Sequence, residues 1–470
     1  MSIYCFAIIV VLMMFFSYKT YLISKNDDIA GDCYTYHLIA QQMEVMRNIP
    51  QYLTCYIIDR NNKYIFDYPP LFIYLFSKLS KNIRDNKFKY INSCLDIINL
   101  LFTAILFYCI FNDTLKAVFA SVLVYFTPII QRSGLDFTGR VFANILYNGI
   151  MLSFICWILY TNYIFLIMIF LLGYIFLLSH KFELQSFLIL GISYSIFLQY
   201  FDFIIFIIIL LLTAYAFLKK YRIILKGHLR FLKDCYFHYN PFLKKEIKKK
   251  DFLKLFLYNP MIFLIYYLYY LNDDLFYKNL LSVISISSIT VLLIIAFLVV
   301  FIKKLNFIGA GERYLEQTSI FTAYLIIENY YFINQYLLNI FLTLEVLTCI
   351  LVINKFYKNI FQKENKEILE MCEFLKTIDR DNIFCKISKT GYGNFIAYNT
   401  EKCLLSDLSS CGFRDTLDIM FEKISINEII KKYNINILII DDDYKLNSDI
   451  TCTLSAAYIG EKYKVFLMEK

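Results

Sequence analysis

Long runs without a charged residue constrain this chain more than any other feature. Residues 161–179 and 281–302 contain no charged side chain. A run of about 18 or more apolar residues can cross the ~30 Å hydrocarbon core of a bilayer as a helix, and a backbone in lipid must satisfy its own hydrogen bonds. The fold class that we predict is therefore a polytopic α-helical membrane protein with about 10 to 13 spans.

The composition agrees with a membrane location, since 59% of the 470 residues are hydrophobic and only 18% are charged. A soluble chain of this length carries many more surface charges. The apolar segment at residues 3–16 lacks a basic flank and a small-residue cleavage site, so we interpret it as a retained first helix. The 13 cysteines form no CxxC pair, although Cys33 and Cys55 share one predicted loop, where a disulfide is the alternative to two free thiols.

Polarity divides the chain into regions. Residues 1–355 hold the apolar runs, and we predict that the polar loop at 24–90 is exterior, with helices along the membrane surface. Basic residues gather at 218–251, which we predict to be a cytoplasmic loop by the positive-inside rule; binding of anionic lipid or of nucleic acid is the alternative. The run at 187–218 is interrupted at 199–202, as two spans or as one broken span. Residues 356–470 predict a small α/β domain outside the cytoplasm.

Two motifs in the first loop carry polar groups beside the membrane. Asp32 precedes an amphipathic segment that contains His37, where its carboxylate suits a general base or a divalent-cation ligand; an N-cap is the alternative. Further on, Asp67 is followed by Tyr68, Pro69 and Pro70. Proline in a first helical turn starts a helix cleanly, which is the structural explanation for this motif.

Three further motifs place charges next to apolar runs. Arg140 precedes a span, where its guanidinium suits a phosphate oxygen; a snorkelling interface arginine is the alternative. His180 and Lys181 lie between two apolar runs and are candidates for function because ionisable groups are costly there. A glycine-rich segment leads into Glu312, Arg313 and Tyr314, which suit an anionic ligand or an ion pair at a helix start.

The order of these motifs resembles that of the GT-C class of integral-membrane glycosyltransferases. An early Asp32, a Tyr68-Pro69-Pro70-Leu-Phe segment, an Arg140 after a Thr-Pro span and a late Glu312-Arg313-Tyr-Leu segment occur in one order over roughly residues 3–353. The class includes the protein-O-mannosyltransferase-like and aminoarabinose-transferase-like families and the bacterial RgtA/B/C/D-like group. Many members carry an acidic pair in the first loop, whereas Cys33 and Tyr34 follow Asp32 here.

The resemblance implies a polyprenyl-phosphate sugar as donor and transfer with inversion to a protein, lipid or glycan acceptor on the non-cytoplasmic face. It assigns Asp32 as the catalytic base, and Arg140 and Arg313 to the donor phosphate. A divalent cation at Asp32 stays open, and no other cofactor and no nucleic-acid partner are expected. Further residues are expected to line the same cavity: His37, Asp67, Tyr68, Pro69, His180, Lys181, Glu312 and Tyr314.

Two other function classes compete with this hypothesis. A transporter or flippase for lipid-linked saccharide predicts charges within the middle of spans and internal duplication, whereas most charges here lie at the ends of apolar runs. A polysaccharide polymerase or ligase predicts a large late exterior loop, whereas the largest predicted exterior loop is the early one. A bacterial inner membrane is the expected location, with the endoplasmic reticulum as the alternative.

Overall fold

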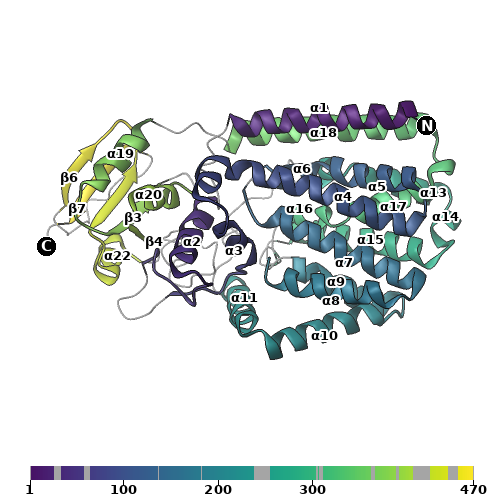
Figure 1. The fold of residues 1–470 in the computed structure, drawn as a ribbon, viewed down its shortest axis with the longest axis horizontal. Helices are drawn as coiled ribbons and strands as arrows, with labels where there is room; N and C mark the ends of the chain where they lie inside the picture. The colour runs from purple at the N-terminus through teal and green to yellow at the C-terminus, as the bar shows by residue number, and fades with distance from the viewer. Residues whose placement is uncertain are drawn as a thin grey trace.

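The computed structural model describes residues 2–25, 33–57, 64–135, 137–180, 183–237, 255–302, 305, 308, 311–360, 366–387, 391–405, 424–442 and 454–468. Asp32 and Lys181 lie outside these ranges. A helical bundle occupies one end of the molecule and a sheet with flanking helices the other, with the first-loop helices between them (Figure 1).

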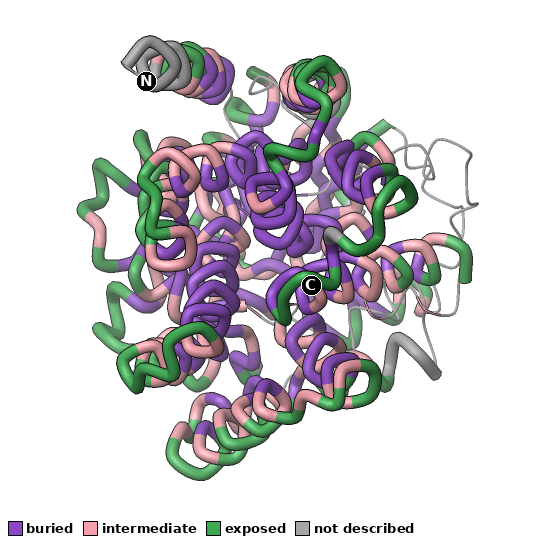
Figure 2. The backbone as a smooth tube through the Cα atoms, turned by 90° about the vertical axis from the view of Figure 1, so that its right-hand side faces the viewer, coloured by how far each residue is buried: buried purple, intermediate pink, exposed green. Residues whose placement is uncertain are grey.

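The bundle consists of apolar helices that run side by side. Its long helices are α1 (Ser2–Ser24), α4 (Ile91–Phe111), α5 (Thr114–Phe126), α7 (Arg140–Tyr160), α8 (Tyr163–Leu177), α9 (Glu183–Phe197), α10 (Asp202–Phe217), α13 (Met261–Leu271), α15 (Leu280–Phe301), α17 (Ser319–Glu328) and α18 (Gln335–Ile360). Their buried residues face the interior of the bundle and their exposed residues face outward (Figure 2). Because many outward residues are large and apolar, such as Leu212 and Tyr270, lipid is the medium that suits this surface.

Four described helices are long and apolar enough to cross a membrane by themselves, and a bent pair made of α10 and α11 (Lys219–Phe237) adds a fifth. Five shorter apolar helices accompany them. Together they reach the lower end of the predicted range of spans only if each one crosses. The predicted interruption at 199–202 is a true helix end, because Gln199 adopts a left-handed φ of 52° between α9 and α10.

The C-terminal region is the predicted α/β domain. Its five-stranded sheet has the order β4-β3-β5-β7-β6, with the first three strands parallel and the last two antiparallel. The strands are β3 (Asn382–Lys386), β4 (Cys403–Leu405), β5 (Ile437–Asp441), β6 (Leu454–Ile459) and β7 (Tyr463–Met468), and the helices are α19 (Lys366–Lys376), α20 (Tyr392–Thr400) and α22 (Ile426–Tyr433).

The domain shares its hydrophobic core with the first loop. Helices α2 (Cys33–Met46) and α3 (Leu71–Ser77) contribute to the same buried cluster as α19, α20 and the sheet. The ring of Tyr34 packs edge-on against Phe395 at 4.9 Å between centroids, and a parallel bridge joins Tyr56 to Leu404 at the edge strand. The domain therefore lies on the same side of the bundle as the first loop.

The basic helix α11 also lies on that side. Lys220 donates to the carbonyl of Phe66 and lies 4.1 Å from the centroid of its ring. A Cβ added to Gly227 would overlap Oδ2 of Asp67, so helix and loop are in close contact. The prediction that the basic segment and the first loop face opposite sides of the membrane is therefore wrong for the described part of that segment, residues 218–237.

Candidate functional site

An arginine–glutamate cluster lies at the end of the bundle that faces the first loop. Arg132 is the second-last residue of α6 (Pro128–Ser133), and Glu312 is the first residue of α16 (Glu312–Glu316). Nη1 of Arg132 donates to Oε1 of Glu312 at 3.2 Å and to the hydroxyl of Tyr258 at 2.9 Å. Arg132 and Glu312 are both partly exposed, at 26% and 29% of their side-chain surface, so the cluster remains open to a ligand.

Arg140 completes this cluster from the start of α7. Its Nη1 lies 3.4 Å from Oγ of Ser133, which follows Arg132 in the chain. Burial alone would raise the pKa of the Glu312 carboxyl. The charge of Arg132, the hydrogen bonds from the Glu312 backbone and from Arg132 and, to a smaller extent, the charge of Arg140 together outweigh burial and hold this pKa below its usual value. Glu312 is therefore ionised at neutral pH, and two cations share one anion.

The turn that separates the two arginines rests on a buried ion pair. Nζ of Lys19 lies 2.5 Å from Oδ2 of Asp96, and 3.0 Å from Oε1 of Gln131. Both charged side chains are almost fully buried. A Cβ on Gly134 would lie 2.6 Å from Nζ of Lys19, so only glycine lets the turn pass over the pair. The ion pair thereby fixes the position of the turn that lies between Arg132 and Arg140.

Glu316 and Tyr314 connect α16 to its neighbours. The amide of Asn144 in α7 donates to Oε1 of Glu316. Beneath the cluster, the hydroxyl of the buried Tyr314 donates to the carbonyl of Ile308 at 3.2 Å and lies 3.4 Å from Oε1 of Gln185. Gln185 in turn lies 3.4 Å from Nε2 of His228 in α11. Helix α16 is thus tied to α7, α9 and α11.

The first-loop helices pack directly against the segment that leads to Arg140. Phe137 contacts the ring of Tyr36 in α2, with 6.2 Å between centroids, and that of Phe76 in α3, at 4.7 Å. A Cβ on Gly139 would touch Phe72 at 3.3 Å. Arg140 therefore follows a segment that is held by α3 and by α2, the helix that begins with Cys33, the residue after Asp32.

The predicted Asp67-Tyr68-Pro69 motif lies in the same region. Asp67 and Pro69 are buried, and the hydroxyl of Tyr68 lies 3.1 Å from that of Tyr36. The amide of Leu71, at the start of α3, donates to the carbonyl of Leu178 at 2.9 Å. This bond brings the motif beside half-buried His180, two residues further along the chain.

His37 is buried among the first-loop helices. It is 3% exposed, and its two ring nitrogens each lie 3.0 Å from a backbone carbonyl, those of Cys33 and Arg84. Burial lowers the pKa of His37 from its usual 6.5, although these two carbonyls oppose the shift. His37 is therefore held within the packing of α2, and its place in the lining of a cavity stays a prediction. Cys33 and Cys55 are not joined by a disulfide.

The cluster brings together two of the predicted residues, Glu312 and Arg140, and Arg313 follows Glu312 in α16. Sequence reasoning missed Arg132, Tyr258, Asn144 and Glu316. For Arg132 a signal was present, because it stands in a short segment between Pro128 and Gly134 that leads to Arg140. Within the described ranges, no group of three His, Cys, Asp or Glu side chains is placed to hold a metal ion; Asp32 lies outside them.

The fold is similar to those of solved membrane glycosyltransferases. ArnT from Cupriavidus metallidurans, solved bound to undecaprenyl phosphate, superimposes with a TM-score of 0.56 over 97% of each chain at 7% identity. The oligosaccharyltransferase AglB from Archaeoglobus fulgidus, solved with an inhibitory peptide and a dolichol-phosphate, superimposes with a TM-score of 0.53 at 10% identity over 88% of this chain. An oligosaccharyltransferase from Archaeoglobus fulgidus solved in the apo form gives a TM-score of 0.53 at 11% identity.

This chain spans 66% of the length of the archaeal enzyme. No protein-family model matches it, and no curated protein matches its sequence. The similarity therefore shows that this chain shares the fold of ArnT and of the archaeal oligosaccharyltransferase, which is the kind of fold that the motif order implied.

Proposed function

We propose that this protein is a membrane glycosyltransferase that moves a sugar from a polyprenyl-phosphate donor to an acceptor on the non-cytoplasmic face. The observation that carries the proposal is the pair of arginines, Arg132 and Arg140, which flank Glu312 beside the first-loop helices. The similar structures of ArnT and AglB were solved with undecaprenyl phosphate and dolichol-phosphate respectively, which supports a lipid phosphate as the ligand.

The charge of the cluster suits such a phosphate. Arg132, Arg140 and Arg313 carry three positive charges, against the two negative charges of Glu312 and Glu316 in α16. A phosphodiester supplies a negative charge that balances this excess of positive charge, and guanidinium groups bind phosphate oxygens through paired hydrogen bonds. At the end of an apolar bundle the phosphate stays at the membrane boundary while the polyprenyl tail remains in hydrocarbon.

Asp32 is the general base in this proposal. Its carboxylate takes the proton of an acceptor hydroxyl, the acceptor oxygen attacks the anomeric carbon, and the bond from that carbon to the phosphate oxygen breaks. The displacement inverts the anomeric centre. Arg132 and Arg140 stabilise the negative charge that develops on the departing lipid phosphate. Support for the position of Asp32 comes from Cys33, with which α2 begins, and from the packing of α2 against Phe137.

Glu312 holds Arg132 in place before the donor binds. Its ion pair with Arg132 fixes the fork of that side chain, which also lies across the ring of Tyr258 at 5.3 Å from the centroid. A preorganised cation needs less rearrangement when charge develops in the transition state. Asp67, Tyr68, Pro69, His180, Lys181 and Tyr314 form the surroundings of the donor in this proposal.

The bacterial plasma membrane is the location that we propose, with the first loop, the arginine cluster and the C-terminal domain on its exterior side. The packing of these three parts against one another supports a common side. The endoplasmic reticulum, with the same parts in the lumen, is the alternative location.

Binding of undecaprenyl phosphate to the purified protein tests the proposal without an acceptor. We expect Arg132→Met and Arg140→Met to weaken binding about tenfold or more each, and Arg132→Lys to recover only part of the loss because it lacks the planar fork. Lys116→Met removes a cation at the opposite end of α5 and serves as the matched control. Equal affinity for the two arginine variants and the control would rule out the cluster as the phosphate site.

A further inference from the structure

Helix α11 carries a row of exposed cations that the sugar-transfer proposal does not use. Lys219, Lys226, Arg230 and Lys233 are exposed and follow one another at intervals of seven, four and three residues. These intervals place them along one face of a helix. The opposite face, with Tyr221, Ile224 and Gly227, is buried. We call these four exposed residues the cationic stripe.

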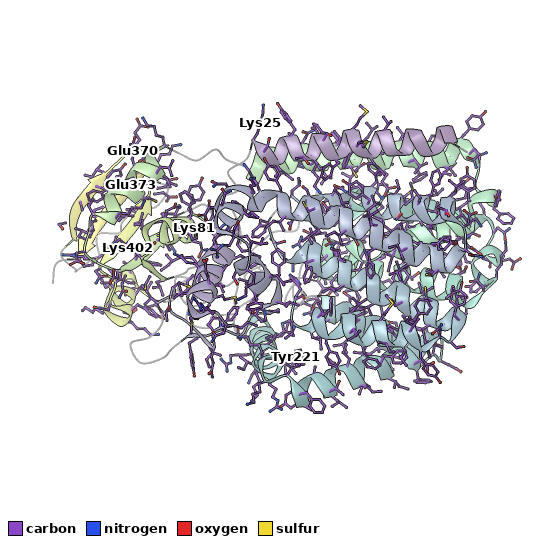
Figure 3. All side chains as sticks on the ribbon, viewed as in Figure 1. Lys25, Lys81, Tyr221, Glu370, Glu373 and Lys402 are labelled. Carbon is purple, nitrogen blue, oxygen red and sulfur yellow. The ribbon has the colours of Figure 1, made fainter. Side chains whose placement is uncertain are left out.

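The position of α11 places this stripe at the membrane boundary. The chain bends by 115° between α10 and α11, so α11 runs across the direction of α10, which lies alongside the other bundle helices (Figure 1). In a membrane that the bundle helices cross, α11 therefore lies close to the membrane plane. Figure 1 shows α11 across the end of the bundle, beside α3, and Figure 3 labels Tyr221 near its start. This end of the bundle is the one that carries Arg132, Arg140 and the first loop, where lipid headgroups meet the protein.

The outer face of α11 also holds apolar groups among its cations. Leu229 is 57% exposed beside Arg230, and Phe217, at the end of α10, is 82% exposed. An exposed mixture of large apolar and basic residues is typical of helices that lie in the headgroup region, where the apolar group enters the acyl boundary and the cations meet phosphates.

Charge complementarity identifies the partner. Helix α11 contains six lysines and arginines and a single acidic residue. Lys220 donates to the carbonyl of Phe66, and Arg222 donates to carbonyls at the end of α10. These two cations therefore stabilise the fold. The stripe presents its charge to the surroundings instead.

We propose that the cationic stripe of α11 binds the headgroups of anionic phospholipids in the leaflet that carries the first loop. This concentrates anionic lipid beside the bundle end and anchors α11 against Asp67. The inference requires a membrane but not sugar transfer, so it stands or falls separately from the proposed function.

The single tryptophan of the chain makes a local test possible. Trp157→Phe removes the native fluorophore, and Leu229→Trp places a new indole in the stripe. The protein is reconstituted in phosphatidylcholine vesicles with a fixed share of phosphatidylglycerol, and either lipid carries bromine near the headgroup as a quencher. At low salt we expect the phosphatidylglycerol quencher to be about fivefold enriched over the phosphatidylcholine quencher at the introduced indole, the factor expected for one cation near an anionic surface.

Neutralisation distinguishes the stripe from general attraction to a basic protein. Lys226→Gln, Arg230→Gln and Lys233→Gln together should remove the preference, as should 0.5 M salt, which shortens the Debye length to about 4 Å. The control combines Lys366→Gln, Lys376→Gln and Lys431→Gln on exposed faces of the C-terminal domain and should retain the preference. Three outcomes would each overturn the proposal: equal quenching by the two lipids, no quenching by either lipid, or a preference that survives neutralisation of the stripe. Equal quenching would indicate that the stripe binds a polyanion other than an anionic phospholipid.

Discussion

The buried pair between Lys19 and Asp96 gives the sharpest stability prediction. Lys19→Met removes one charge and leaves the Asp96 carboxylate in the bundle without its cation. Both side chains have at most 1% of their surface exposed. Removing one partner of a buried pair costs about 3–5 kcal/mol, because the remaining charge stays desolvated. We expect a loss of this size in the free energy of unfolding.

Replacing both partners tests the reason for that loss. Lys19→Met combined with Asp96→Leu leaves no buried charge, so the double variant should lie within about 1–2 kcal/mol of the wild type. Lys366→Met is the matched control, since its ion pair with Glu370 has side chains that are 91% and 58% exposed. It should change stability by less than about 1 kcal/mol.

The assay is reversible unfolding in mixed detergent micelles, followed by far-ultraviolet circular dichroism for all four proteins. A cost below about 1 kcal/mol for Lys19→Met, similar to that of the control, would refute the reasoning because it would mean that water or another cation reaches Asp96. A double variant as unstable as the single one would also refute it, because the loss would then come from packing around Gly134 rather than from an unpaired charge.

Three further predictions concern the contacts of the first loop. Gly227→Ala should displace α11, because the new Cβ would overlap Oδ2 of Asp67, whereas Gly393→Ala meets no atom closer than 3.4 Å; protease cleavage within α11 should increase only for the first. The pKa of His37 is lowered by burial, so the unfolded chain binds a proton at this side chain more readily than the folded protein does. The stability advantage of wild type over His37→Phe should therefore shrink as the pH falls below 6.5, which unfolding at about pH 8 and about pH 5 measures. Phe395→Ala should cost about 3–5 kcal/mol and expose the first loop to limited proteolysis as well as the C-terminal domain, because the two share one core; cleavage confined to the domain would contradict this.

Much of the fold follows from patterns that act locally. The starts and ends of α4, α7 and α8 were predictable because apolar runs end at polar or left-handed residues such as Asn112 and Thr161. The strands β3 and β5 follow from short apolar runs. The short edge strand β4 could not be predicted in this way. Its three residues pair with both β3 and the first loop, and the local sequence does not indicate these distant partners.

The candidate site was only partly predictable for the same physical reason. Arg140 and Glu312 are conspicuous because each charged residue stands where an apolar run begins. Their meeting depends on the Lys19–Asp96 pair and on Gly134, which join three distant parts of the chain. The side on which α11 lies was mispredicted because the positive-inside rule counts charges and does not see that Lys220 and Gly227 contact residues 66–67.

Sugar transfer from a lipid phosphate is the central claim, and one measurement tests it most directly. Purified wild-type protein and Asp32→Asn are each supplied with a radiolabelled sugar on undecaprenyl phosphate and with membrane extract as the source of acceptor. We predict label transfer by the wild type and a loss of about 100-fold or more in the variant. Equal transfer by both proteins, or none by the wild type above a protein-free control, would contradict the claim.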